Sequence, residues 1–182
     1  QFSMHMWTSI TVGFIFAFPF ILWEIWKFIS PALYEKEKKY AASFIIISSF
    51  LFFVGVLFGY YLIAPLSVQF FASYIVSPEI SNSIDIDSYI SLMKTSAIAS
   101  GLLFELPIII FFLSKMGLVN PEFLRKYRKY TLVIVLILSA IITPPDVISQ
   151  VIVAIPIMIL YEVSILISVL VVKSQEKEKL KA

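Results

Sequence analysis

WEIWKFISPALYEKEKKY, residues Trp23 to Tyr40, is a charged segment between two long apolar runs. Aromatic residues and lysines are the side chains that membrane helices place where the hydrocarbon core of a bilayer meets water. We call residues 27–40 the first elbow. Its composition predicts that the apolar runs on either side of it cross a membrane and meet on one face.

Composition supports a membrane protein. Hydrophobic residues make up 60% of the 182 positions and charged residues only 14%, which is too much apolar surface for a soluble globule to bury. The net charge of +2 is too small to indicate nucleic-acid binding. The chain has no cysteine, which excludes disulfide frameworks and thiolate metal sites. We therefore expect an all-α polytopic membrane protein.

Five apolar runs are long enough to be considered as membrane helices of a single integral-membrane domain over residues 1–182. They are residues 4–26, 41–64, 95–114, 130–143 and 147–172. A helix rises about 1.5 Å per residue and the hydrocarbon core is about 30 Å thick, so the fourth run, at roughly 21 Å, is short. Local thinning of the bilayer, or snorkelling of Arg128 and Lys129, would accommodate it. Pro19, Pro107 and Pro156 lie inside runs and predict bent helices.

Charge placement orients the spans. All of the 14 Lys and Arg residues except Lys94 lie in residues 27–40, in a second elbow at residues 115–129, or in the tail at residues 173–182. The positive-inside rule places these three segments in the cytoplasm, and residues 65–94 and 144–146 outside. Asp87 and Ser88 predict the N-cap of a short interfacial helix in the first outside connection. An outside N-terminus and a start at Gln1 predict that a preceding span is missing.

The two elbows resemble each other. Ser30-Pro31 and Asn120-Pro121 each read as an N-cap followed by proline in the first helical turn, leading into a basic helix. A duplicated hairpin would produce this likeness. Chance similarity between two lysine-rich loops would also produce it, and this is the favoured interpretation.

Two features inside the spans are notable. Glu105 lies near the middle of its span, where a charge costs on the order of 2.5 to 3.5 kcal/mol, so the acid is protonated, paired or facing water. A polar docking point or proton-relay acid is favoured over a neutral acid bonded to a neighbouring helix. Gly55 and Gly59, four apart on one face, would allow a close helix contact, although a single such pair is a weak signal.

Enzymatic motifs are absent. The one histidine, His5, has no metal-ligand partners in a recognisable pattern, and no nucleophile motif occurs. We expect no catalytic site, no metal site and no cofactor. In the first elbow, Glu35 and Glu37 stand among lysines. A self-neutralised solvated helix is the simpler interpretation, and a carboxylate that receives a cationic ligand beside Phe28 and Leu33 is the alternative.

Four blocks of the chain together resemble a known family. They are WKFISPALYEKEKK (Trp26–Lys39), FELP (Phe104–Pro107), LRKYRKY (Leu124–Tyr130) and TPPDVISQ (Thr143–Gln150). In this order and spacing they are similar to the signature blocks of TatC, the receptor subunit of the twin-arginine protein translocase. The resemblance covers essentially all 182 residues and implies a bacterial inner-membrane protein, spans two to six of a six-span bundle with a concave face.

The resemblance also implies site residues. Glu37 matches a glutamate that binds the paired arginines of signal peptides, Phe28 matches a nearby aromatic residue, and Glu105 matches an intramembrane glutamate. Thr143 and Gln150 match positions where the single-span partners TatA and TatB dock, and Asp146 matches the acid of the external turn. A second glutamate of the arginine site lies on the family's N-terminal tip, which this sequence lacks. If the molecule is truly this short, its arginine site would have only one of the two glutamates.

We therefore expect a receptor that binds twin-arginine signal peptides, docks TatA- and TatB-type partners and forms homo-oligomers in a larger complex. Folded proteins would cross at the expense of the proton gradient, and the chain itself would do no covalent chemistry. The alternative is a proton-coupled small-molecule transporter with Glu105 as relay acid, which predicts a second mid-membrane ionisable partner. A purely structural assembly subunit is a third hypothesis.

Overall fold

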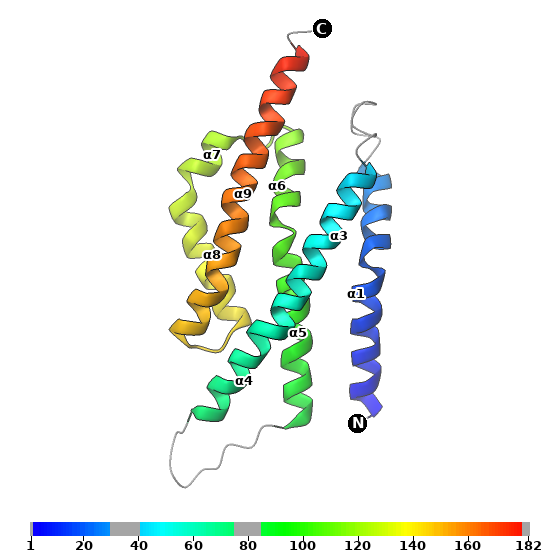
Figure 1. The fold of residues 1–182 in the computed structure, drawn as a ribbon, viewed down its shortest axis with the longest axis vertical. Helices are drawn as coiled ribbons and strands as arrows, with labels where there is room; N and C mark the ends of the chain where they lie inside the picture. The colour runs from blue at the N-terminus through cyan, green and yellow to red at the C-terminus, as the bar shows by residue number, and fades with distance from the viewer. Residues whose placement is uncertain (1, 30–40, 75–84, 180–182) are drawn as a thin grey trace.

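The computed structural model describes residues 2–29, 41–74 and 85–179, and it shows an elongated bundle of helices (Figure 1). Every regular element within these ranges is helical, which confirms the all-α prediction. The elements are α1 (Phe2–Ile29), α3 (Ala41–Phe58), η2 (Gly59–Ile63), α4 (Ala64–Ser73), α5 (Ile86–Phe104), α6 (Leu106–Lys115), α7 (Pro121–Lys126), α8 (Arg128–Ile142) and α9 (Val147–Lys179).

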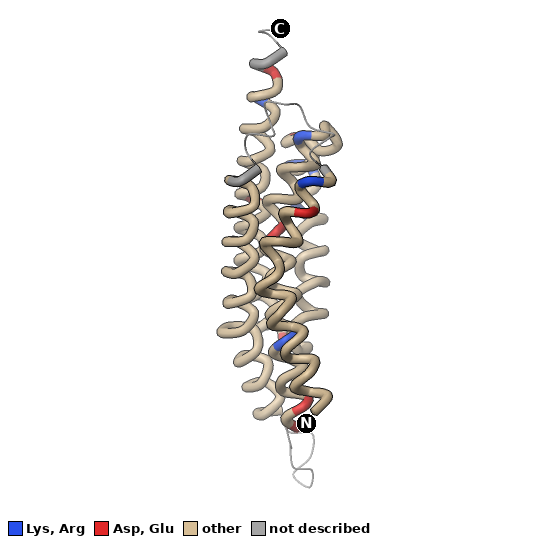
Figure 2. The backbone as a smooth tube through the Cα atoms, turned by 90° about the vertical axis from the view of Figure 1, so that its right-hand side faces the viewer, with Lys and Arg blue, Asp and Glu red and all other residues tan. Residues whose placement is uncertain are grey.

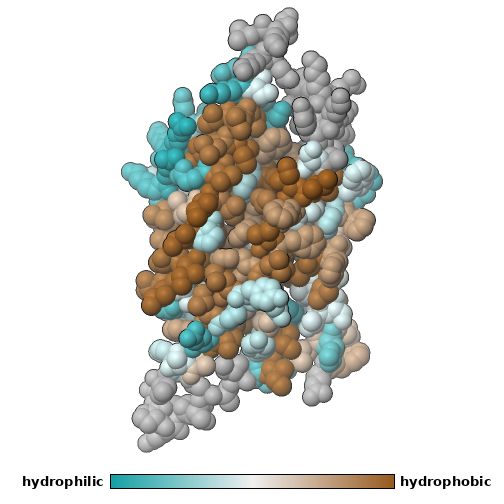
Figure 3. All heavy atoms as spheres, viewed as in Figure 1, coloured by the Kyte–Doolittle hydropathy of each residue, from teal (hydrophilic) through white to brown (hydrophobic). Residues whose placement is uncertain are grey.

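Four helical segments of the described chain are long and apolar enough to cross a membrane: residues Phe2–Phe28, Ser43–Ser73, Ile86–Lys115 and Val147–Glu176. The fifth apolar helix, α8, has 15 residues and is therefore only about 22 Å long. The start of α1 and the end of α9 lie at opposite ends of the bundle, as an odd number of crossings requires (Figure 1). Figure 3 shows the apolar surface as a broad belt between more hydrophilic ends.

The second and third apolar runs form longer helices than the sequence predicts. The helix that begins at Ala41 continues through the π-helical turn η2 and α4 to Ser73, beyond the predicted end at Ala64. Pro65 lies two residues after the end of η2, and a wider turn relieves the clash between a proline ring and the carbonyl group four residues earlier. α5 begins at Ile86, so the expected short interfacial helix is continuous with the span, and Asp85 rather than Asp87 occupies the N-cap position.

The last helix also extends beyond its predicted span. α9 continues beyond the predicted end at Val172 to Lys179, through residues that the sequence predicts to be a cytoplasmic tail. Lysine, glutamate and glutamine are strong helix formers, which favours continuation. The side chain of Gln175 adds a tether, because its Nε2 donates a hydrogen bond of 2.9 Å to the carbonyl oxygen of Lys115 at the end of α6.

Glycines bring α3 and α5 into backbone contact. A Cβ atom on Gly59 would lie 2.3 Å from the carbonyl oxygen of Ser96, and one on Gly55 would lie 2.7 Å from that of Ser100. From the other side, a Cβ atom on Gly101 would lie 2.8 Å from the ring of Phe52. The close contact that the Gly55 and Gly59 pair indicates is therefore confirmed, and a third glycine contributes to it.

The other half of the bundle is built around α9. The hydroxyl group of Tyr161 donates to the carbonyl oxygen of Leu124 in α7 at 2.8 Å, and Ser114 of α6 donates to Ser168 at 2.8 Å. A cluster of buried apolar residues joins this half to η2, and its members are Ile63, Val135, Val153, Ala154 and Ile157. These contacts hold α6, α7 and α8 against one central helix.

We predict that Gly59→Ala destabilises the bundle. Alanine favours the helix over glycine by about 1 kcal/mol. Its methyl group would, however, overlap a backbone oxygen that cannot rotate away. We expect this overpacking to lower the free energy of unfolding by about 1–3 kcal/mol after the gain in helix propensity is subtracted. Gly13→Ala is the matched control, because a Cβ atom there meets nothing within 4 Å. Thermal unfolding in detergent should show a lower midpoint for Gly59→Ala only. Equal midpoints for the two variants would show that the glycine contact is not tight.

Candidate functional site

Glu105 lies at the break between α5 and α6. Proline at position 107 has no N–H to donate, so the regular helix pattern is interrupted and Glu105 N donates to the carbonyl oxygen of Leu102 at 3.2 Å. The amides of Ile108 and Ile109 both donate to the carbonyl oxygen of Glu105 at 3.0 Å. The acid is thereby placed on a bend that the sequence itself dictates.

The Glu105 side chain is buried and only half satisfied. Its exposed fraction is 7%, and its Oε2 accepts a hydrogen bond from the hydroxyl group of Ser48 in α3. Its Oε1 has no hydrogen-bond partner among the described residues. A buried oxygen without a donor is costly, so this atom can hold a proton or accept a hydrogen bond from a polar group that approaches it.

The structure brings three of the predicted residues together where α8 connects to α9: Thr143 and Asp146 lie in the turn, and Gln150 lies in the first turn of α9. Thr143 is buried and its hydroxyl group donates to the carbonyl oxygen of Ser139 at 2.8 Å, while Gln150 Nε2 donates to that of Leu136 at 2.8 Å. Asp146 Oδ2 accepts from the amide of Ser149 at 2.9 Å and so caps α9.

Hydrogen bonds from the Ser149 backbone and hydroxyl group hold the pKa of Asp146 below its ordinary value. The acid therefore remains ionised at neutral pH and keeps its role as a cap. Its position at the helix N-terminus also favours a negative charge. Among the described residues, no hydrogen bond or ion pair connects this turn to Glu105.

A groove runs along the outer face of α8 and α9. Its volume is about 680 Å³ and its lining is almost wholly apolar, with Leu136, Ile155 and Ile159 among the residues along it. Glu162 lies in the lining, and its Oε2 accepts a hydrogen bond of 2.6 Å from Nη2 of Arg128. The two residues are 34 positions apart, and no local pattern indicates such a contact.

The elbows are described in part. Phe28, near the end of α1, is 87% exposed, whereas Leu33 and Glu37 lie outside the described residues, as does the Ser30-Pro31 pair. In the second elbow, the side chain of Asn120 accepts a hydrogen bond of 2.8 Å from the amide of Phe123. The predicted N-cap at Asn120 is therefore confirmed. Among the described residues, no three His, Asp or Glu side chains lie together as metal ligands would.

Comparison with known proteins places the chain in a family. The family model described as Sec-independent protein translocase protein (TatC) matches residues 1–156. The TatC protein of Blattabacterium sp. subsp. Periplaneta americana is 45% identical over 175 residues, which are 96% of this chain and 66% of that protein. The TatC protein of Desulforapulum autotrophicum is 42% identical over 91% of this chain and 61% of its own length, so the chain spans less than two thirds of these relatives.

A solved structure agrees. A crystal structure described as Twin Arginine Translocase Receptor TatC is 38% identical, with a TM-score of 0.76 over 94% of this chain and 75% of that one. The fold is therefore shared over most of this chain. On these grounds the chain belongs to the TatC family of Sec-independent protein translocase proteins.

Proposed function

We propose that this chain is the receptor component of a twin-arginine translocase in the bacterial inner membrane. In this proposal, it binds paired-arginine signal peptides at its cytoplasmic end and docks TatA- and TatB-type single-span partners within the bilayer. Folded proteins then cross at the expense of the proton gradient. The observation that carries the proposal is the family match over most of the chain, together with a relative described as the receptor. Members of the family are components of a protein translocase, and the family is not a family of enzymes.

The first elbow is the proposed recognition site. α1 ends at Ile29 and α3 begins at Ala41, so both helices lead into residues 30–40. Most of the described Lys and Arg residues lie toward the end of the bundle where α6 and α9 finish (Figure 2), and the positive-inside rule favours the cytoplasm for this end. Phe28 is exposed there, and an aromatic face attracts a guanidinium group. In the proposal, Glu37 provides the carboxylate for a bidentate arginine contact, and Leu33 provides an apolar contact for the peptide.

We predict that Glu37→Gln weakens binding of a twin-arginine signal peptide by about tenfold or more. Hydrogen bonds to charged groups contribute about 1.5–3 kcal/mol, and the amide removes the charge while keeping the shape. Binding is measured by fluorescence anisotropy with the labelled peptide and with the same peptide carrying paired lysine, which should bind weakly to both proteins. Glu122→Gln, an exposed acid in the second elbow, is the matched control and should change nothing. Unchanged affinity in Glu37→Gln would discard the role of this residue.

The groove along α8 and α9 is the proposed docking site for a partner helix. It is apolar, and the turn that contains Thr143 and Gln150 lies beside it because Gln150 bonds to the carbonyl group of Leu136, a residue in the groove lining. The amide oxygen of Gln150 makes no hydrogen bond within the described chain and remains available. Inside the bilayer, polar side chains stabilise helix pairs by about 0.6–2 kcal/mol per contact. Glu105, with one free oxygen, is a second proposed polar contact.

We predict that Ile155→Trp reduces co-purification of TatA- and TatB-type partners in mild detergent. Ile155 is 54% exposed and lines the groove, so an indole ring would occupy the space of the partner helix. Ile141→Trp, on an exposed face of α8 outside the groove lining, is the control. Glu105→Ala should also weaken association if its free oxygen meets a partner. Full co-purification with Ile155→Trp would place the docking site elsewhere.

The transporter alternative requires an ionisable partner for Glu105 within the membrane. The hydrogen-bond partner of its side chain in the described chain is the hydroxyl group of Ser48, which does not titrate in this range. The peptide assay also separates the two functions, because a small-molecule transporter would not distinguish paired arginine from paired lysine.

A further inference from the structure

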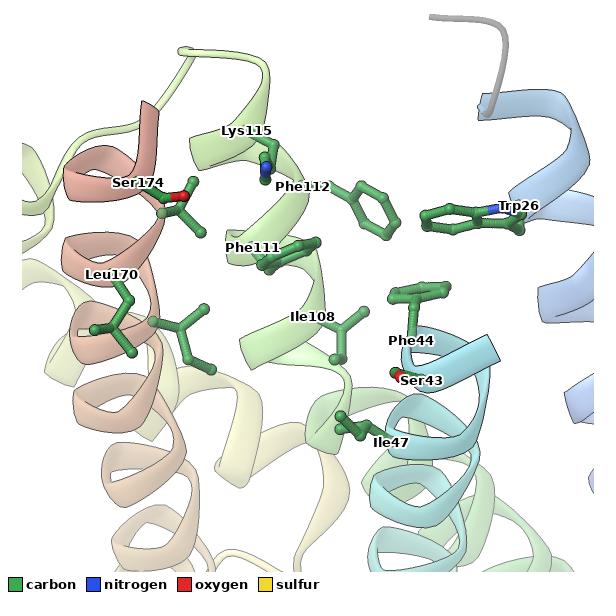
Figure 4. A pocket seen from close by; sticks show the side chains of 12 residues that line it. Trp26, Ser43, Phe44, Ile47, Ile108, Phe111, Phe112, Lys115, Leu170 and Ser174 are labelled. Carbon is green, nitrogen blue, oxygen red and sulfur yellow. The ribbon is translucent and has the colours of Figure 1, made fainter. Parts of the chain in front are cut away.

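A second apolar groove lies between α1, α3, α6 and α9, on a different side of the bundle from the α8/α9 groove. Its volume is about 440 Å³, within the range of ligand pockets (Figure 4). One wall is aromatic: the ring of Phe44 lies 5.1 Å from that of Trp26 and 4.7 Å from that of Phe112, measured between centroids. Leu170 of α9 lines the opposite side. We call this the aromatic groove.

The polar residues of the aromatic groove all lie near one end of their helices. Ser43 is in the first turn of α3, Lys115 is the last residue of α6, and Ser174 follows the apolar part of α9. Figure 4 shows Lys115 and Ser174 at the same end of the groove, with Ile108 and Ile47 farther along it. The groove therefore has a polar, basic mouth and an apolar interior.

The dimensions fit a chain better than a helix. The lining extends from Lys115 back to Ile108 in α6, which is seven residues or about 10 Å. This is about two thirds of one leaflet, because the hydrocarbon core is about 30 Å thick. A helix with side chains is about 10–12 Å wide. An extended hydrocarbon chain is much narrower and can enter.

Charge indicates which lipid. The mouth of the aromatic groove is at the end of the bundle toward which most of the described Lys and Arg residues lie (Figure 2). Basic pockets between membrane helices bind anionic headgroups, and each Lys or Arg near the surface contributes about 1 kcal/mol toward anionic lipid, which is about fivefold in affinity. A phosphate group at the mouth would meet the Lys115 ammonium group and the Ser174 hydroxyl group.

We propose that the aromatic groove is a binding site for an anionic phospholipid, with one acyl chain between α6, α9 and the aromatic wall and the phosphate group at Lys115 and Ser174. Its lining shares no residue with the α8/α9 groove or with the residues proposed to bind the signal peptide. The lipid would fill the space between the α1/α3 half and the α6/α9 half at this end of the bundle, and so stabilise their arrangement.

Fluorescence quenching by brominated lipids tests the proposal, because Trp26 lines the groove. Substitution of Trp7 and Trp23 by Phe leaves Trp26 as the single tryptophan, since the chain has three. The protein is placed in phosphatidylcholine vesicles, and lipid with brominated acyl chains is added as either phosphatidylglycerol or phosphatidylcholine. We expect half-maximal quenching at about a fivefold lower fraction of the anionic lipid.

Variants separate the groove from a general attraction to the basic surface. Lys115→Gln should bring the two quenching curves together, whereas Lys94→Gln, about 30 Å away along α5 and α6, should preserve the preference. Ile108→Phe should fill the groove and reduce quenching by both lipids, and the exposed neighbour Ile109→Phe should not. Circular dichroism and thermal unfolding confirm that each variant is folded.

Three outcomes would overturn the proposal. Equal quenching by the two lipids in the protein with its groove unaltered would show that the groove does not select an anionic headgroup. A preference that survives Lys115→Gln would place the selective contact elsewhere. The third outcome is that the two lipids quench equally and that a signal peptide abolishes quenching by both. This result would identify the apolar segment of the peptide as the occupant of the groove.

Discussion

The hydrogen bond between Ser48 and Glu105 is the interaction on which the arrangement of this bundle depends. It sits where α3 crosses α5 and α6, in an apolar part of the protein where an isolated carboxylate is costly. The hydroxyl group reaches the acid because Gly55, Gly59 and Gly101 allow the two helix backbones to touch. Larger residues at these positions would separate the helices and leave the acid without its donor.

This crossing divides the bundle into two halves with different surfaces. α1 and α3 pack on one side of the bend at Glu105, and α6, α7 and α8 pack against α9 on the other. The two grooves follow from this division: one lies along the outer face of the α8/α9 hairpin, and the other lies between the halves at the basic end. The bend imposed by Pro107 therefore fixes both the buried acid and the space beside it.

Much of this fold could be predicted from local sequence. The apolar runs predicted the long helices, and the Asn120-Pro121 pair predicted the start of α7. Glu105 was recognised because acidic residues are rare in apolar runs. The end of α4 at Ser73 and the start of α5 at Ile86 were not predicted, because these helices extend beyond the apolar runs into more polar sequence. Neither the pairing of Ser48 with Glu105, 57 positions apart, nor that of Arg128 with Glu162 follows from any short motif. Leu33 and Glu37 lie outside the described residues, so their roles remain predictions.

Receptor function requires the first elbow to face the compartment in which signal peptides are made. The absence of cysteine makes a direct measurement simple, because a single introduced cysteine is unique. In spheroplasts treated with a membrane-impermeant maleimide, Ala32→Cys should stay unlabelled and become reactive only in inverted vesicles, whereas Ser81→Cys should react in spheroplasts. Labelling of Ala32→Cys in spheroplasts would show that the first elbow faces the outside, and it would contradict recognition at the cytoplasmic face.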